Sequence, residues 1–256
     1  CLLGIGSPLA VAAAIFHIIN HATFKAALFM IAGIIDHESG TRDLRKLSGL
    51  WQLLPFTATL TMITAASMAG VPLTNGFLSK EMFFTELLAN LSGPTLLASA
   101  VVATCAGIFA VAYSTRLVHG VFFDGPLGQN IPNKDAHEPP LGMRAPAMLL
   151  AVLCILVGVL PALLLEHIVN ATARASTQNF SFEGSHLAIW HGFNTPLLMS
   201  VIALVGGLVF YFALAKGGRL REIDLDPHLG PLQGKLIFEN ALKHLLQFSR
   251  TLKRRT

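Results

Sequence analysis

Lys80 is an ionisable residue inside an apolar part of the chain, in the stretch GVPLTNGFLSKE at 70–81. No charge occurs between residues 47 and 79, and Gly, Pro and Asn interrupt the apolar run just before the lysine. Irregular backbone is tolerated inside a membrane only where protein or a water-filled cavity surrounds it. Burial disfavours the ammonium form, so an amine placed there can switch between charged and neutral states. Lys80 is therefore our first candidate for a proton-carrying group.

A second set of titratable residues repeats every four positions in the first apolar segment. His17, His21 and Lys25 lie within about 80° of one another on a helix and extend over about 12 Å of its axis. Asn20 lies beside them and could hold water. Such a stripe can relay protons, since each group is within one water of the next. The alternative is that each histidine satisfies a polar partner between packed helices.

Besides Asn20, two charged residues, Glu81 and Arg116, are accessory candidates. Glu81 follows Lys80 directly, but adjacent helical residues point about 100° apart, which makes it a doubtful direct partner. Glu86 comes one turn later, and both acids could instead reach toward the outer membrane surface. Arg116 precedes the end of its apolar segment by about one turn and either anchors that end at the interface or lines a proton exit.

The segments that carry these residues are those of an integral membrane protein. The chain is 53% hydrophobic and 12% charged, with a mean hydropathy of +0.62, whereas soluble domains are about 25% charged. Five windows are long enough to span a bilayer, at about 20 residues each: 8–35, 55–90, 95–123, 145–167 and 194–215. The second suits a helix in two halves, and the last two carry no charged side chain within the bilayer and are expected to be scaffold. We expect an all-α bundle with a discontinuous helix near 70–76.

Basic residues predict the orientation of the bundle. Lys and Arg number three in 36–54, two in 124–144 and nine in 216–256, against one, Arg174, in the alternate connections. By the positive-inside rule the three rich segments, including the C-terminal tail, are cytoplasmic. Residues 234–252 show the periodicity of an amphipathic helix on the membrane surface. The same rule accounts for the net charge of +4 without nucleic-acid binding.

Other functional classes find little support in the sequence. The three cysteines have no C-x-x-C spacing, no HExxH motif occurs, and the remaining histidines lie near segment ends, so we expect neither a metal nor a haem or other cofactor. No nucleophile motif, P-loop or dinucleotide fingerprint indicates an enzyme. The chain begins at Cys1 inside an apolar run, without Met or a signal pattern, and we expect it to be a fragment.

Three stretches resemble one superfamily of membrane proteins. HIINHATFKAALF at 17–29 and GVPLTNGFLSKE at 70–81 are similar to the antiporter-like subunits shared by respiratory complex I and the multisubunit Mrp sodium/proton antiporters, and DHESGTRD at 36–43 is most similar to the A-type subunits of Mrp. The resemblance implies that Lys80 is the lysine of the second broken helix and that His17, His21 and Lys25 belong to the polar axis leading to it. It also implies that residues 1–123 are the later part of a translocation domain and that the amphipathic segment after Gly234 is the start of a lateral helix. The apolar windows place two further spans within 124–215, followed by a cytoplasmic tail over 216–256.

Two transport functions and one structural alternative remain at this point. The first is a subunit of a multisubunit cation/proton antiporter in the cytoplasmic membrane, working with other membrane subunits on H⁺ and Na⁺. The second is a proton-pumping subunit of an NADH-quinone oxidoreductase or a related redox complex. A purely structural scaffold is disfavoured, because each intramembrane charge costs about 2.5–3.5 kcal/mol even on the mildest scale.

Overall fold

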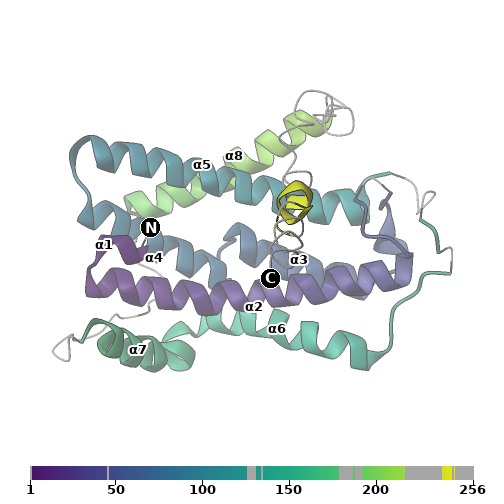
Figure 1. The fold of residues 1–256 in the computed structure, drawn as a ribbon, viewed down its shortest axis with the longest axis horizontal. Coiled ribbons are helices and arrows are strands. Elements are labelled where there is room, and N and C mark those ends of the chain that lie inside the picture. The colour runs from purple at the N-terminus through teal and green to yellow at the C-terminus, as the bar shows by residue number, and fades with distance from the viewer. Residues whose placement is uncertain are drawn as a thin grey trace, which may run out of the picture. The chain divides into compact units, whose positions relative to one another are not determined.

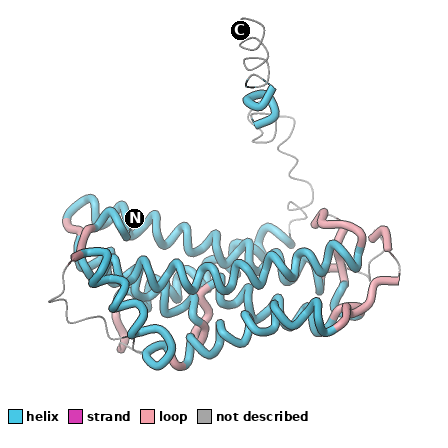
Figure 2. Tube along the Cα trace, turned by 60° about the horizontal axis from the view of Figure 1, so that its bottom comes forward, coloured by secondary structure: helices cyan, strands magenta, loops and turns pink. Residues whose placement is uncertain are grey.

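The computed structural model describes residues 2–44, 46–125, 131–133, 135–178, 187, 192–216, 238–243 and 245. The elements are α1 (Leu2–Ile5), α2 (Pro8–Ser39), a 3-10 turn (Leu50–Gln52), α3 (Pro55–Ala69), α4 (Asn75–Asn90), α5 (Gly93–Val118), a π-helical turn (His119–Phe123), α6 (Leu141–Val159), a second π-helical turn (Ala162–Glu166), α7 (His167–Thr177) and α8 (Thr195–Lys216). These described residues form helices and loops without a strand, which confirms the predicted all-α class (Figure 2). Contacts divide the chain into two units, residues 1–212 and 213–256, and the bundle described below is the first.

Helix α2 is the long central helix of the bundle (Figure 1). The Ser7 hydroxyl accepts a hydrogen bond from the backbone N–H of Ala10, and Pro8 occupies the first turn, where its missing N–H costs nothing. Gly40 ends the helix in the left-handed conformation, at φ 75°. Between these caps α2 packs against α3, α4, α6 and α7, so its residues face neighbours on several sides.

Two apolar clusters hold the bundle together, one toward each end of α2. One joins the end of α2 to the start of α3, the π-helical turn after α5 and α6, and includes Ile35, Leu54 and Phe122. The other joins the first half of α2 to α4, α6 and α7, and includes Phe16 and Phe77. The polar groups described below lie between and beside these clusters.

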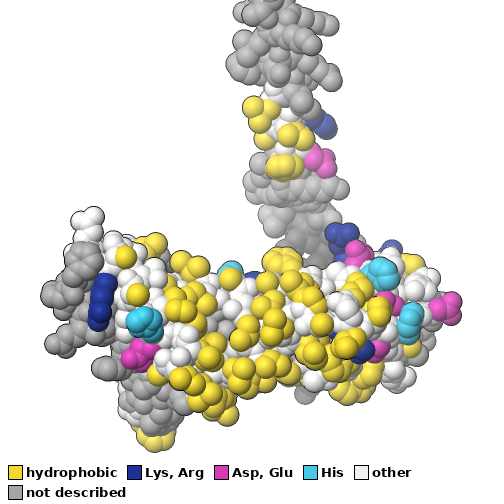
Figure 3. All heavy atoms as spheres, turned by 90° about the horizontal axis from the view of Figure 1, so that it is seen from below, with side chains coloured by type: hydrophobic (Ala, Val, Ile, Leu, Met, Phe, Trp, Pro, Cys, Tyr) yellow, Lys and Arg dark blue, Asp and Glu magenta, His cyan; other side chains and the backbone are white. Residues whose placement is uncertain are grey.

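The outer surface is that of a multi-pass membrane protein. Within the described residues, four helices are long and apolar enough to cross a bilayer: Pro8–Ser39, Gly93–Phe123, Leu141–Val159 and Thr195–Ala215. Helices α3 and α4 supply the two halves of the remaining expected span. In Figure 3 apolar side chains cover the middle of the visible face, while charged residues and histidines gather mostly toward its two ends.

The fourth expected span differs from the structure in its boundaries. We expected it over 145–167, but α6 begins at Leu141 and ends at Val159. The break follows from Pro161, because a residue that precedes proline is pushed out of the helical conformation, and Leu160 has φ −128° and ψ 52°. The chain then continues as α7, which the sequence did not lead us to expect; its Val169 and Ala173 pack against the cluster around Phe16.

The expected amphipathic helix at 234–252 falls mostly outside the described residues. The described positions 238–243 and 245 are helical, and Phe238, Leu242 and Leu245 expose their apolar side chains there. The expected domain boundaries after residues 123 and 215 remain predictions, as does the cytoplasmic placement of the C-terminal tail.

Candidate functional site

The predicted helix break is present between α3 and α4. Gly70 ends α3 in the left-handed conformation, at φ 79°, and its N–H returns to the carbonyls of Ala66 and Ser67. Leu73 also has a positive φ, 67°, which is uncommon for a residue with a side chain. The Thr74 hydroxyl donates to the carbonyl of Val71 at 2.7 Å, and α4 starts at the next residue. The break is thus a fixed turn whose backbone groups largely find partners within it.

Lys80 lies in a narrow slot beside this break. Its Nζ donates to the carbonyl of Ala69, at 3.4 Å, at the C-terminal end of α3. Two glycines make room for the side chain: a Cβ on Gly70 would lie 3.0 Å from Lys80 Cδ, and one on Gly107 of α5 would lie 3.2 Å from both Cε and Nζ. The partial negative charge at a helix C-terminus favours a cation there. The turn between the half-helices therefore presents a carbonyl to the lysine, and α5 closes the slot.

The stripe on α2 opens onto the same cavity as Lys80. A cavity of about 530 Å³ is lined by His17, His21, Lys25, Ser79 and Lys80, among other residues. The two imidazole rings lie 5.7 Å apart, centre to centre, and the His17 Nδ1 lies 2.7 Å from the Ser79 hydroxyl on α4. The expected row of titratable groups and the buried lysine are therefore brought together around one space.

Lys25 takes the end of this row farthest from His17. Its Nζ lies 5.6 Å from the centre of the Tyr113 ring on α5, within the range of a cation–π contact. Tyr113 also lines the cavity. Helices α2, α4 and α5 each contribute titratable or hydroxyl groups to it.

Asn20 belongs to a buried row of polar side chains that reaches the cavity at Ser67. Its side-chain oxygen accepts a hydrogen bond from Nδ2 of Asn75, at 3.1 Å, and the Ser67 hydroxyl donates to Oδ1 of Asn75. Asn20 is 1% exposed, and its Nδ2 has no partner in the part of the chain that the structure describes. A buried amide in this state is a place where an ordered water can bind.

The acidic candidates on α4 face different neighbours. The Glu81 carboxylate accepts a hydrogen bond from the hydroxyl of Ser200 on α8, at 2.5 Å. Glu86 accepts from Ser7, at 3.1 Å, and from Asn90, at 3.2 Å, rather than extending from the surface of the bundle. Both carboxylates belong to residues that are 8% exposed.

Arg116, by contrast, is an exposed residue near the end of α5. His119, one turn on, lies 3.0 Å from the Tyr211 hydroxyl on α8 through its Nδ1. The α8 partners, Ser200 and Tyr211, were not expected from the sequence, in which the last two spans look like scaffold.

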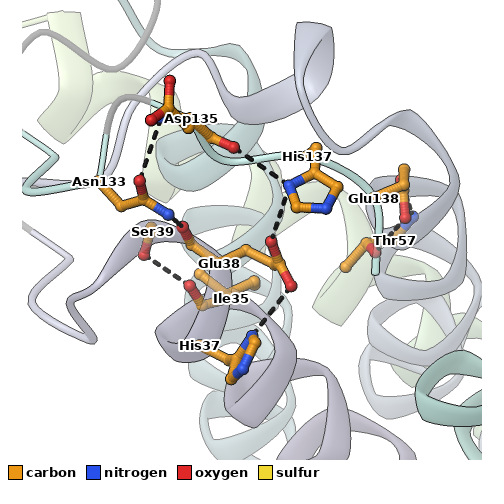
Figure 4. A network of polar contacts seen from close by, with 9 residues as sticks. All are labelled: Ile35, His37, Glu38, Ser39, Thr57, Asn133, Asp135, His137 and Glu138. Carbon is orange, nitrogen blue, oxygen red and sulfur yellow. Dashed lines mark hydrogen bonds and ion pairs between the residues drawn. The ribbon is translucent and has the colours of Figure 1, made fainter. Parts of the chain in front are cut away.

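A second polar cluster, which we call the clasp, joins the segment before α6 to the C-terminal end of α2 and to the N-terminal end of α3 (Figure 4). The Glu38 carboxylate lies 2.9 Å from Nδ1 of His37 and 3.5 Å from Nδ1 of His137. Asn133 donates its side-chain amide to the Glu38 carbonyl, at 2.7 Å, and its N–H to the Ser39 carbonyl, at 3.1 Å. Both segments were expected on the cytoplasmic side, and they meet at one end of the bundle.

The other half of the clasp caps α3. The Glu138 carboxylate accepts hydrogen bonds from the backbone N–H and the hydroxyl of Thr57, both at 2.9 Å, and lies 3.5 Å from Arg144. The first turn of a helix has N–H groups without intrahelical partners, and the residue that precedes α3, Leu54, supplies no side-chain cap. Glu138, far along the chain, takes that role.

Comparisons with known proteins agree with the fold and with the motifs. Residues 1–107 match the family described as "NADH:quinone oxidoreductase/Mrp antiporter, TM". The chain is 51% identical over 246 residues to a probable K(+)/H(+) antiporter A/B subunit of Rhizobium meliloti, over 94% of this chain and 24% of that protein. It is 40% identical over 215 residues to the A subunit of a Na(+)/H(+) antiporter of Alkalihalophilus pseudofirmus, over 80% of this chain and 27% of that protein.

A solved structure gives the same answer for the fold. One chain in the "Structure of Mrp complex from Dietzia sp. DQ12-45-1b" superposes with a TM-score of 0.78 at 34% identity, over 98% of this chain and 26% of the other. The present chain thus spans about a quarter of the length of the curated relatives it matches.

Proposed function

We propose that this chain belongs to the membrane-protein family of NADH:quinone oxidoreductase and Mrp antiporters, as part of an Mrp-type A subunit. Within such a protein, we propose that it moves protons against a monovalent cation. The observation that carries the proposal is the shared cavity, in which Lys80 meets His17 and His21. The relatives' names favour antiport over a redox-driven arm.

The geometry supports a stepwise proton path with Lys80 at its inner end. Protons pass among Lys25, His21 and His17 and the water that the cavity can hold, and reach the amine of Lys80. When charged, that amine is stabilised by the Ala69 carbonyl. Each step moves one proton from a donor to the neighbouring acceptor and changes no oxidation state, so the path needs no cofactor. Glu81 supplies a negative charge one residue away from the amine.

Na⁺ is the cation we propose, because several A subunits similar to this chain are named for Na⁺/H⁺ exchange. K⁺ is a second candidate, because the relative that is 51% identical carries the name of a K⁺/H⁺ antiporter. Hard cations bind to oxygen ligands, and the cavity presents mainly nitrogen and apolar groups, so we place the cation site in another part of the full-length protein or in a partner.

The partners we propose are other membrane subunits of the same complex. The similarity to a chain of the Mrp complex supports them. We place the assembly in the cytoplasmic membrane, with the clasp and the C-terminal tail on the cytoplasmic side, on the strength of the distribution of Lys and Arg.

The experiment uses the full-length protein, expressed with its partner subunits in everted vesicles from antiporter-deficient cells. Lys80→Ala is expected to abolish the collapse of the pH gradient that Na⁺ or K⁺ causes, while the complex still assembles. Lys46→Ala, in an exposed loop position, is the matched control and should retain transport. Unchanged transport in Lys80→Ala would exclude Lys80 from the path. A pH gradient built by NADH, with no response to cations, would instead favour the redox-driven alternative.

A further inference from the structure

Helix α8 contributes a buried hydroxyl to the Lys80 site. Ser200 is fully buried, and its hydroxyl donates to Oε1 of Glu81 at 2.5 Å. That length is typical of a hydroxyl bonded to an ionised carboxylate, which makes it one of the stronger classes of hydrogen bond. The two residues are 119 positions apart, and Ser200 lies outside residues 1–107, which match the family profile.

The same face of α8 also touches the lysine slot. Ala203 follows Ser200 by three residues, so both lie on one side of the helix. A Cβ added to Gly107 of α5 would lie 2.9 Å from Ala203 Cβ and 3.2 Å from the end of the Lys80 side chain. Near this point α8 crosses α5, where Gly207 allows the close approach (Figure 1). One face of α8 therefore bonds to Glu81 and lies beside the slot that holds its neighbour Lys80.

Adjacent residues with opposite charge can interact in two ways inside a membrane. If the Glu81 carboxylate swung toward Lys80, it would stabilise the ammonium form and the amine would retain its proton. In the structure one oxygen of the carboxylate, Oε1, is bonded to α8, and the Lys80 amine is directed to the carbonyl of Ala69. The hydrogen bond from Ser200 thus affects the strength of the electrostatic interaction between the Glu81 carboxylate and the Lys80 amine. The other titratable groups around the cavity of Lys80 are His17, His21 and Lys25 of α2 and Tyr113 of α5.

We propose that Ser200 is a positioning residue for proton transfer, which holds the Glu81 carboxylate away from Lys80 and so lets the amine release its proton. This inference rests on the proposed function. Without the hydroxyl, the carboxylate turns toward the amine and the ammonium form is stabilised. Lys80 then gives up its proton only at a higher pH.

The test measures cation-dependent collapse of the pH gradient across a range of pH, in everted vesicles that contain the full-length protein with its partners. Ser200→Ala is expected to move the half-maximal activity upward by about one pH unit, with assembly unchanged on native gels. Ser200→Thr keeps the hydroxyl and should restore most of the wild-type profile. Ser114→Ala is the matched control, because Ser114 is also buried but its hydroxyl donates to Ala110 of its own helix, at 2.6 Å.

Each other outcome overturns the assignment. A Ser200→Ala profile that superimposes on wild type shows that the hydroxyl does not position the carboxylate. A shift of equal size in Ser114→Ala shows a general packing effect, and loss of assembly in Ser200→Ala shows a structural anchor. Lys80→Ala in the same vesicles separates this inference from the proposed function: if it abolishes transport while Ser200→Ala behaves as wild type, only the role of Ser200 falls.

Discussion

Gly107→Ala is the sharpest test of the slot around Lys80. The added methyl group would lie 2.9 Å from Ala203 Cβ and 3.2 Å from Cε and Nζ of Lys80. Carbon atoms pack best at about 3.5–4.0 Å, so α8 would have to retreat by at least about 0.6 Å. Overpacking of this kind costs about 1–3 kcal/mol, while alanine in place of glycine in a helix returns about 0.5–1 kcal/mol. The expected net loss of stability is about 1 kcal/mol.

The functional effect is expected to be larger than the effect on stability. The new methyl group occupies the space next to the lysine amine, so cation-dependent collapse of the pH gradient in everted vesicles should fall severely. Gly142→Ala on α6 is the matched control, because nothing lies within 4 Å of a Cβ at that position. It should leave transport unchanged and raise the unfolding temperature slightly, because alanine in place of a helical glycine gains up to about 0.5–1 kcal/mol with no clash to offset it.

A second substitution separates crowding against α8 from crowding against Lys80. Ala203→Gly removes the carbon that the new methyl group meets, so Gly107→Ala/Ala203→Gly should recover the thermal stability of the purified complex. Transport should stay impaired, because the contact with Lys80 remains. If the double variant recovered transport as well, or if Gly107→Ala alone transported normally, the slot would not constrain the lysine and the reasoning would be wrong.

Three other predictions rest on contacts described above. Asn75→Leu removes the hydrogen bond to Asn20 and leaves the buried Asn20 amide without that partner, which should cost about 1–3 kcal/mol of stability. The unfolding temperature of the complex should fall, and an unchanged temperature would show that the hydrogen bonds among Asn20, Asn75 and Ser67 are not stabilising. Glu138→Ala removes the cap from Thr57 and should cost about 1–2 kcal/mol; chemical denaturation would detect it, and no change would mean that water caps α3 equally well. Gly158→Ala places a methyl group in steric overlap with the carbonyl of Leu73 in the helix break and should reduce assembly on native gels, so normal assembly would contradict the close packing of α6 on the break.

The local features of the site were predictable because they lie within one segment. Gly70 and its neighbours predicted the break, since glycine and proline lower the stability of a helix that runs through them. His17, His21 and Lys25 shared a face because the helical repeat places every fourth residue together. The structure adds that this face and Lys80 border one cavity.

The contacts that the sequence did not predict join residues far apart in the chain. Nothing near Ser200 marks it as the partner of Glu81, because an uncharged apolar span with one serine is typical of scaffold. Glu38 likewise meets His137 only after α2 and the segment before α6 are placed at one end of the bundle. The early end of α6, in contrast, has a local signal in Pro161, because a residue that precedes proline disfavours the helical conformation even inside an apolar window.

The clasp fixes the N-terminal end of α3. Glu138 holds the first turn of the helix, while its last turn ends at the break, where Ala69 contacts the lysine. A helix of 15 residues is about 22 Å long, so a tilt of about 5° around the clasp displaces the inner end by about 2 Å. The contact between Nζ and the Ala69 carbonyl is already 3.4 Å long, and a displacement of that size would break it. A small rotation of α3 about its first turn would therefore be enough to break the contact between Lys80 and the last turn of the helix.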